Sequence, residues 1–182
     1  MLGGLVADFV RGTLDPALPR GVRAGIALHR SIDTYTDAHP QVVAARALFE
    51  PPYRRYAGIL LDVWFDHLLA RDWARHADGS LHAFSAEVQR LLLARAGELP
   101  PRMRGFADYL QRNDLPEAYR ERAMIGAVLH GLSQRLSRDN PLAQALPLIE
   151  ALAAPIQRHF DAFFPDLRAH AQRERQRLGA AA

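Results

Sequence analysis

The chain has 182 residues, 49% of them hydrophobic, which is enough for one folded domain with a sizeable core. It contains no cysteine, which excludes disulfides, thiolate metal sites and cysteine nucleophiles. All 23 basic residues are arginine, which excludes a lysine Schiff base and a phosphate-loop lysine. A genome rich in G and C would produce the same bias, and the net charge of +3 leaves room for an acidic or phosphate-bearing partner.

The sequence favours a cytoplasmic protein that does not insert into membranes. No basic, apolar and small-residue leader opens the chain, and no run of about 18 apolar residues follows. No recognised nucleic-acid motif accompanies the arginines, so we expect no nucleic-acid partner.

Apolar residues recur at three- and four-residue spacing through most of the chain, which predicts an all-α fold. The first predicted helix ends at Asp15-Pro16, and the second covers about 21–38 and ends at His39-Pro40. Further helices are expected at 60–70, 81–95, 102–112, 117–136 and 142–164. No strand pattern and no glycine-rich phosphate loop appears among them.

Turn residues and prolines delimit the later helices. Ser80 is a plausible N-cap, and Pro147 and Pro155 should kink or split the last long segment. Pro165 indicates another break, and residues 173–182 read as a flexible tail. Residues 1–172 would then form a single-domain helical bundle.

Two helices carry metal-competent side chains at helical spacing. His29 and Asp33 are four residues apart, as are Asp62 and Asp66, so each pair lies on one helix face. The first pair continues to Asp37, and a His–Asp hydrogen bond on a helix surface would explain it equally simply.

The second helix favours a metal more strongly. Asp62, Asp66 and His67 interrupt an apolar run that contains Trp64 and Phe65, and burying carboxylates is costly unless they are paired or bound to a metal. The alternative is that these acids lie on the wet side of the helix. Imidazole and carboxylate are good ligands for manganese, iron, zinc or magnesium.

Asp8 is a lone acid in the apolar stretch Leu5–Gly12. It could complete the metal site, or it could be a partly exposed residue paired with Arg11.

Three strings of this sequence resemble the acyl-carrier-protein phosphodiesterase family, also called acyl-carrier-protein hydrolase. They are LVADFVRG from Leu5, HRSIDTYTDAHP from His29 and LDVWFDHLLARDW from Leu61. Looser matches follow at GLSQRL from Gly131 and FDAFFPDL from Phe160, so the resemblance covers nearly the whole chain.

The resemblance implies a fold distantly related to the HD-domain phosphohydrolases, which are helical metal enzymes. It implies manganese-dependent hydrolysis of the phosphodiester that joins 4′-phosphopantetheine to the serine of holo acyl carrier protein, within fatty acid metabolism. The partner would be acyl carrier protein, which is strongly acidic and would be attracted by an arginine-rich surface.

We assign roles to this chain's residues on that basis. The expected metal ligands are Asp8, His29, Asp33, Asp62 and His67. Asp66 would be a further ligand or a base that orients the attacking water. Arg30 and Arg11 are candidates to hold the phosphate, because guanidinium offers it a planar fork, although either could simply be solvated.

The resemblance also implies a segment ahead of Leu5 that contains closely spaced histidines in an HLHLA-like string. This chain starts directly at the motif, so we expect that segment to be missing here.

Two other functions remain open from the sequence alone. A related phosphohydrolase could act on a nucleotide or another small phosphodiester, or the chain could be an inactive module that binds acyl carrier protein.

Overall fold

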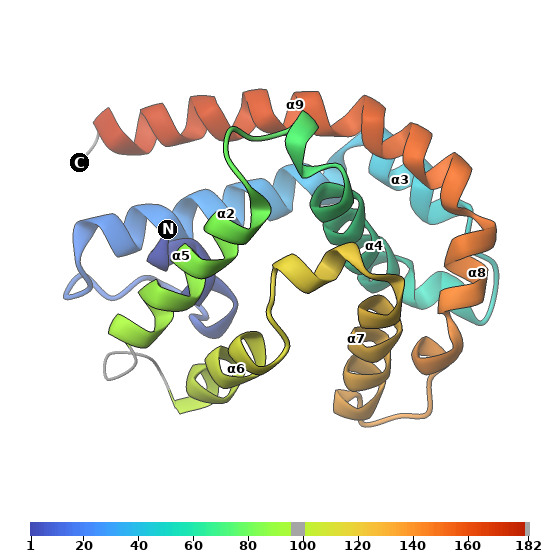
Figure 1. Cartoon of the computed structure of the whole chain (residues 1–182). Helices are drawn as coiled ribbons and strands as arrows, with labels where there is room; N and C mark the ends of the chain where they lie inside the picture. Colours follow the sequence, from blue (N-terminus) through green and yellow to red (C-terminus); the bar gives the residue numbers. More distant parts are fainter. Residues whose placement is uncertain (96–100, 181–182) are drawn as a thin grey trace.

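The computed structural model describes residues 1–95 and 101–180, and these ranges contain no β-strand, which confirms the all-α prediction (Figure 1). The α-helices are α1 Leu2–Val6, α2 Arg20–Ala38, α3 Pro40–Ala47, α4 Ala57–Arg71, α5 Leu81–Ala94, α6 Pro101–Arg112, α7 Arg122–Arg135, α8 Leu146–Ala151 and α9 Ala153–Ala180. Short 3-10 turns are η1 Ala7–Phe9, η2 Tyr53–Tyr56, η3 Trp73–Arg75, η5 Glu117–Arg120 and η6 Leu142–Gln144. In the described ranges no helix is long and apolar enough to cross a lipid bilayer.

Local signals set several helix ends as the sequence predicts. The Ser80 hydroxyl accepts a hydrogen bond from the Ala83 amide at 3.1 Å and caps α5. His39 ends α2 and caps α3, because its Nδ1 accepts from the Gln41 amide at 3.3 Å. The predicted segment 142–164 is split into η6, α8 and the start of α9, with Pro147 in the first turn of α8.

One prediction about the last helix is wrong, and a second concerns residues that the structure shows as helix. Pro165 does not end a helix but lies inside α9. Residues 173–180, predicted as a flexible tail, continue α9 as regular helix, whereas residues 181–182 lie outside the described part of the chain. The predicted helix 117–136 is also two elements, η5 and α7, which meet at Glu121.

The core consists of two hydrophobic clusters. The larger one packs α3, α4, α7, α8 and α9 around Trp64, Leu68 and Phe163, and the smaller one packs α1, α2, α5 and α6 around Ile26 and Leu92. Tyr119 and Met124 pack against both clusters. The two clusters therefore join into one helical bundle.

The two longest helices, α2 and α9, run side by side along one edge of the bundle (Figure 1). The Tyr35 ring of α2 stacks on the His170 ring of α9 at 4.2 Å, and Ser31 Oγ lies 3.0 Å from His170 Nε2. This contact holds the middle of α9 against the face of α2 that carries Ser31 and Tyr35.

Candidate metal centre

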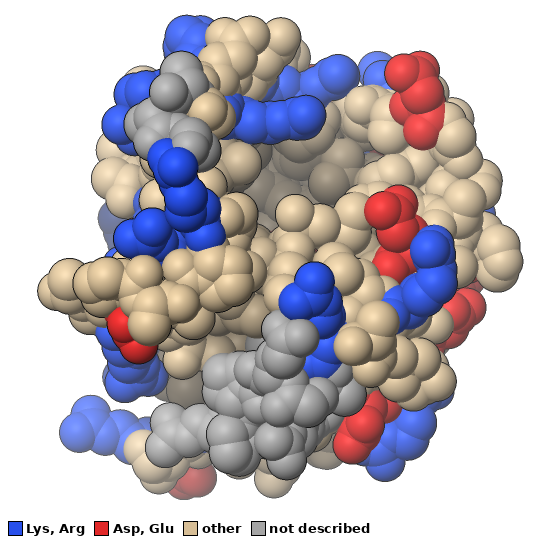
Figure 2. Space-filling model, turned by 90° about the vertical axis from the view of Figure 1, so that its left-hand side faces the viewer, with Lys and Arg blue, Asp and Glu red and all other residues tan. Residues whose placement is uncertain are grey.

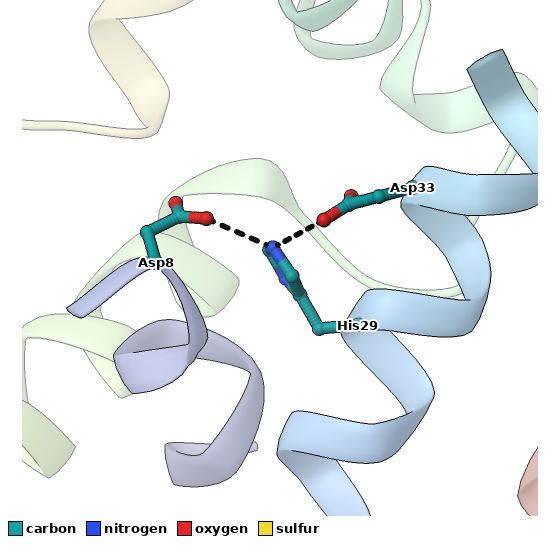
Figure 3. Close-up of side chains that lie close together, drawn as sticks. All are labelled: Asp8, His29 and Asp33. Atoms are coloured by element: carbon teal, nitrogen blue, oxygen red, sulfur yellow. Dashed lines mark hydrogen bonds and ion pairs between the residues drawn. The ribbon is translucent and has the colours of Figure 1, made fainter. Parts of the chain in front are cut away.

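Three side chains from two neighbouring elements converge on a single point (Figure 3). Asp8 comes from η1, whereas His29 and Asp33 lie one turn apart on α2. His29 Nε2 is 3.1 Å from Asp8 Oδ1 and 3.2 Å from Asp33 Oδ2. One donor atom from each residue falls within 4.8 Å of the other two, so a single cation could contact all three.

Two glycines bring Asp8 to His29. A Cβ on Gly3 of α1 would lie 2.2 Å from the Val22 carbonyl oxygen, and a Cβ on Gly25 of α2 would lie 2.8 Å from the Gly3 Cα. The backbones of α1 and α2 therefore touch at this crossing, which only residues without a side chain permit. The chain enters η1 directly after the crossing, beside the turn of α2 that carries His29.

The three residues line a cavity of about 530 Å³, which we call the acidic cavity. Asp37 from α2 and Asp62 and Asp66 from α4 add three more carboxylates to its wall. The other lining residues are one hydroxyl and a set of large apolar side chains, namely Thr36, Phe65, Leu69, Phe160, Phe163, Phe164 and Leu167. The cavity thus combines a cation-binding wall with an aromatic wall supplied mainly by α9.

The surroundings of the two carboxylates on α4, Asp62 and Asp66, disfavour their charged forms. Both Asp62 and Asp66 open onto the water of the cavity, yet protein surrounds them closely enough to disfavour their charged forms. Burial raises the pKa of Asp66 to about 7, and the neighbouring Asp62 charge adds to this rise. Burial also raises the pKa of Asp62 to about 6, which the nearby Arg46 opposes and Asp37, Asp33 and Asp8 reinforce.

The triad around His29 titrates differently. The hydrogen bond between His29 and Asp8 lowers the pKa of Asp8 and raises the pKa of His29. Burial raises the pKa of Asp33 despite the attraction of His29. A proton on His29 Nε2 therefore lies between the Asp8 and Asp33 carboxylates. A metal cation in the same place would be stabilised by the same two negative charges.

The comparisons with known proteins identify the family. The family model for acyl carrier protein phosphodiesterase matches residues 1–167. The chain belongs to the acyl carrier protein phosphodiesterase family. An acyl carrier protein phosphodiesterase from Serratia proteamaculans (strain 568) is 38% identical over 92% of this chain and 87% of its own length. Proteins of the same name from Yersinia enterocolitica and Escherichia coli O157:H7 are 37% and 35% identical, each over 94% of this chain and 90% of their own lengths.

No solved structure matches the chain, so the predicted likeness of this phosphodiesterase family member to HD-domain enzymes stays a prediction. Of the residues expected in the site, the structure gathers Asp8, His29, Asp33, Asp62 and Asp66 around the acidic cavity. It does not bring His67 or Arg30 to the cavity wall.

The structure does not place His67, predicted as a metal ligand, in the acidic cavity. Its side chain is buried on the other side of α4, where its ring lies 4.7 Å from that of Trp64. The His67 Nδ1 atom is 2.8 Å from the Tyr119 carbonyl oxygen. When Nδ1 carries the proton, it donates a hydrogen bond to this oxygen. Burial lowers the pKa of His67, and its hydrogen bond with the Tyr119 carbonyl joins α4 to η5 outside the acidic cavity.

Arg30, expected to hold phosphate, also lies outside the wall of the acidic cavity. Its guanidinium donates one hydrogen bond to the Gly12 carbonyl and one to the Val10 carbonyl, each at 2.8 Å. These bonds tie the segment after η1 to α2. Arg11, the other candidate, is exposed and does not line the cavity.

The sequence did not lead us to predict Arg46 or the aromatic wall as parts of the site. Arg46, from α3, pairs with Asp37 and is the positive charge that most lowers the pKa of Asp62. Nothing in the spacing of α3 points to this role. Asp37 was placed on the helix face of His29 and Asp33 by its four-residue spacing, but it was not among the predicted metal ligands.

Proposed function

We propose that this chain hydrolyses the phosphodiester that joins 4′-phosphopantetheine to the serine of holo acyl carrier protein. Water adds to phosphorus, and the serine oxygen leaves with a proton, which gives apo carrier protein and free 4′-phosphopantetheine. Membership of the acyl carrier protein phosphodiesterase family supports the substrate. The acidic cavity, with one histidine and five carboxylates on its wall, supports the chemistry and is the observation that carries the proposal.

We infer that a divalent cation, Mn²⁺, binds at Asp8, His29, Asp33 and Asp62. The donor set fits it, because imidazole nitrogen and carboxylate oxygens from three separate elements face one space and are ligands that Mn²⁺ accepts. Burial is the main cause of the raised pKa values of Asp62 and Asp66, and neighbouring carboxylates add to it, whereas Arg46 opposes the rise at Asp62. The chemistry supplied by such a cation is activation of water and neutralisation of charge on the phosphoryl oxygens.

Asp66 is our candidate for the general base. It lines the cavity, and among the described residues it has no hydrogen-bond or ion-pair partner that would hold its oxygens. A carboxylate that faces the cavity and has no other partner can accept a proton from the attacking water. Asp62, one turn earlier on α4, would then serve the cation while Asp66 takes the proton.

The test is to incubate the Mn²⁺-loaded protein with holo acyl carrier protein and follow the carrier by mass spectrometry. We expect loss of the 4′-phosphopantetheine mass and a rate that Asp33→Asn lowers by about 100-fold or more, since even outer-shell changes cost about 10- to 100-fold. Asp139→Asn is the matched control, because Asp139 is exposed in the loop between α7 and η6.

Two outcomes would contradict the proposal. Turnover of a nucleotide or another small phosphodiester faster than of holo carrier would assign a different substrate. Binding of the carrier without any release of 4′-phosphopantetheine would indicate an inactive binding module.

A further inference from the structure

The acidic cavity is the first of three hollows that adjoin one another along α9. The second, which we call the arginine basin, has a volume of about 310 Å³ and shares Phe160 and Phe164 with the acidic cavity. The third, the α9 groove, has a volume of about 950 Å³ and shares Pro165 and Arg168 with the arginine basin. A ligand seated in the groove could therefore reach the carboxylates without leaving the protein surface.

The charge of the walls changes sign along this path. The acidic cavity has only carboxylates and a histidine as ionisable lining groups. The arginine basin has Arg75, Arg168 and His76 against a single acid, Asp161, whose Oδ1 already accepts a hydrogen bond from Gln157. No acidic side chain of the described residues lines the α9 groove, which carries two arginines and two glutamines.

The arginines of the groove are available for a partner. Arg168 and Arg175 are exposed, and neither has an acidic partner among the residues that the structure describes. By contrast, Arg177 on the same helix is engaged by Glu174 at 2.7 Å. Figure 2 shows this end of the molecule, where basic side chains crowd around the last turns of α9 beside a hollow.

We propose that α9 is the docking helix for the carrier protein: an acidic surface of the carrier binds Arg168 and Arg175 along the α9 groove and the arginine basin. This inference rests on the proposed function. A protein-linked phosphodiester places its carrier within a few ångströms of the reacting phosphorus, so the carrier must cover a surface that adjoins the acidic cavity. An acidic carrier is repelled by the carboxylates at the cavity itself, whereas the adjoining arginines attract it.

The shared phenylalanines complete the path. Phe160 and Phe164 belong to both the acidic cavity and the arginine basin, and their rings stack at 5.1 Å. A carrier seated on α9 would pass its phosphodiester over this aromatic ridge, with the pantetheine arm lying against the apolar wall of the cavity. The polar contacts then select the protein, and the apolar wall accepts the arm.

The test compares the double variant Arg168→Glu/Arg175→Glu with wild type on holo acyl carrier protein. We expect the Kd for the carrier and the KM to rise by about tenfold or more, because two exposed charge pairs become repulsive, while kcat holds. Arg173→Glu is the matched control for the single variant Arg175→Glu, because each reverses one charge on α9. Arg173 is exposed on the same helix, two residues before Arg175, and lines none of the three hollows. Its Kd and KM should stay near those of wild type.

Binding and turnover separate the two proposals. If wild type hydrolyses holo carrier and the double variant has an unchanged Kd and KM, the docking inference is overturned and the proposed function stands. If wild type binds carrier in a manner that the double variant loses, yet never releases 4′-phosphopantetheine, docking stands and the proposed function fails. Equal weakening by Arg173→Glu would also overturn the inference, because it would reflect net charge rather than a docking surface.

Discussion

At the scale of single residues, the aspartates of the acidic cavity differ in how their neighbours affect their ionisation. Asp8 is stabilised as an anion by its hydrogen bond with His29, whereas Asp62 and Asp66 are held by burial in a state that favours protonation. Asp37 is paired with Arg46. The wall therefore contains Asp37, which forms an ion pair with Arg46, together with two carboxylates that are costly to ionise. A bound cation would lower the free-energy cost of ionising these two.

Asp66→Asn should stabilise the metal-free protein at high pH. Because the pKa of Asp66 is about 7 in the folded chain against an ordinary 3.8, the folded state binds more protons between these values, and stability falls as pH rises through them. In EDTA at about pH 8 we expect a melting temperature a few degrees above wild type. The gain should shrink as pH falls towards about 4.

If Asp66→Asn raised the melting temperature equally at every pH, or lowered it at about pH 8, the charged form of Asp66 would not be destabilising in the folded chain. Asp139→Asn serves as the control here too, since Asp139 is exposed in the loop between α7 and η6.

Arg30→Gln should act on metal binding rather than on substrate binding. Removing the guanidinium frees the Val10 and Gly12 carbonyls, loosens the segment after η1 and lets Asp8 move away from His29. We expect Mn²⁺ affinity to fall by about tenfold, as for other supporting residues of metal sites, with little change in KM when Mn²⁺ is saturating. A raised KM with unchanged Mn²⁺ affinity would instead return Arg30 to the phosphate-binding role.

At the scale of helices, the site depends on how closely α1 approaches α2. Gly25→Ala puts a methyl group 2.8 Å from the Gly3 Cα, so α1 must shift and carry η1 and Asp8 with it. We expect a loss of about 1–3 kcal/mol in the free energy of unfolding, together with weaker Mn²⁺ binding. Thermal melts and Mn²⁺ titration measure both effects.

Gly21→Ala is the matched control on the same helix. A Cβ at Gly21 meets no atom within 4 Å, and alanine favours the helix, so this variant should be neutral or slightly stabilising. Equal losses in the two variants would mean that the close crossing does not position Asp8.

Helical spacing predicted much of the site but could not orient every side chain. Four-residue spacing correctly placed His29 with Asp33 and Asp62 with Asp66, because such pairs share a face wherever that face points. Successive residues are turned by about 100° around the helix axis, so His67 left the face of Asp66 and entered the core. Arg30 left the face of His29 for the same reason.

The positions of proline predicted helix ends less well than residue spacing predicted helix faces. Pro147 lies in the first turn of α8, where its missing N–H has no cost, but Pro165 lies inside α9. The packing of Phe160, Phe163 and Leu167 against the larger core cluster holds both sides of Pro165 in one helix. Tertiary contacts of this kind override a local break signal.

At the scale of the whole molecule, the aromatic wall comes from residues almost one hundred positions beyond the acids of α4. No local pattern in Phe160–Leu167 predicts that these residues line one cavity with Asp66, because this arises only when α9 folds back across the bundle (Figure 1). The same return of the chain puts the arginines of α9 beside a cavity of opposite charge. The molecule therefore separates a cation-binding region from an anion-attracting one along a single helix.

This separation predicts that salt affects carrier binding more strongly than Mn²⁺ binding. Between about 50 and about 300 mM NaCl, screening should raise KM for holo carrier several-fold, because the attraction is between exposed charges. Mn²⁺ affinity should change less, because the cation would sit among partly buried carboxylates at short range. Steady-state kinetics and Mn²⁺ titrations at each salt concentration check this, and a KM that salt leaves unchanged would argue against electrostatic docking.

Direct measurement of Mn²⁺ binding tests the central claim, that Asp8, His29, Asp33 and Asp62 form a cation site. Titration followed by electron paramagnetic resonance should show saturable binding by wild type, near-complete loss in Asp33→Asn and Asp8→Asn, and retention in His67→Gln once the variant is shown to be folded. Saturable binding that survives Asp33→Asn unchanged, or no binding by the wild-type chain, would contradict the account.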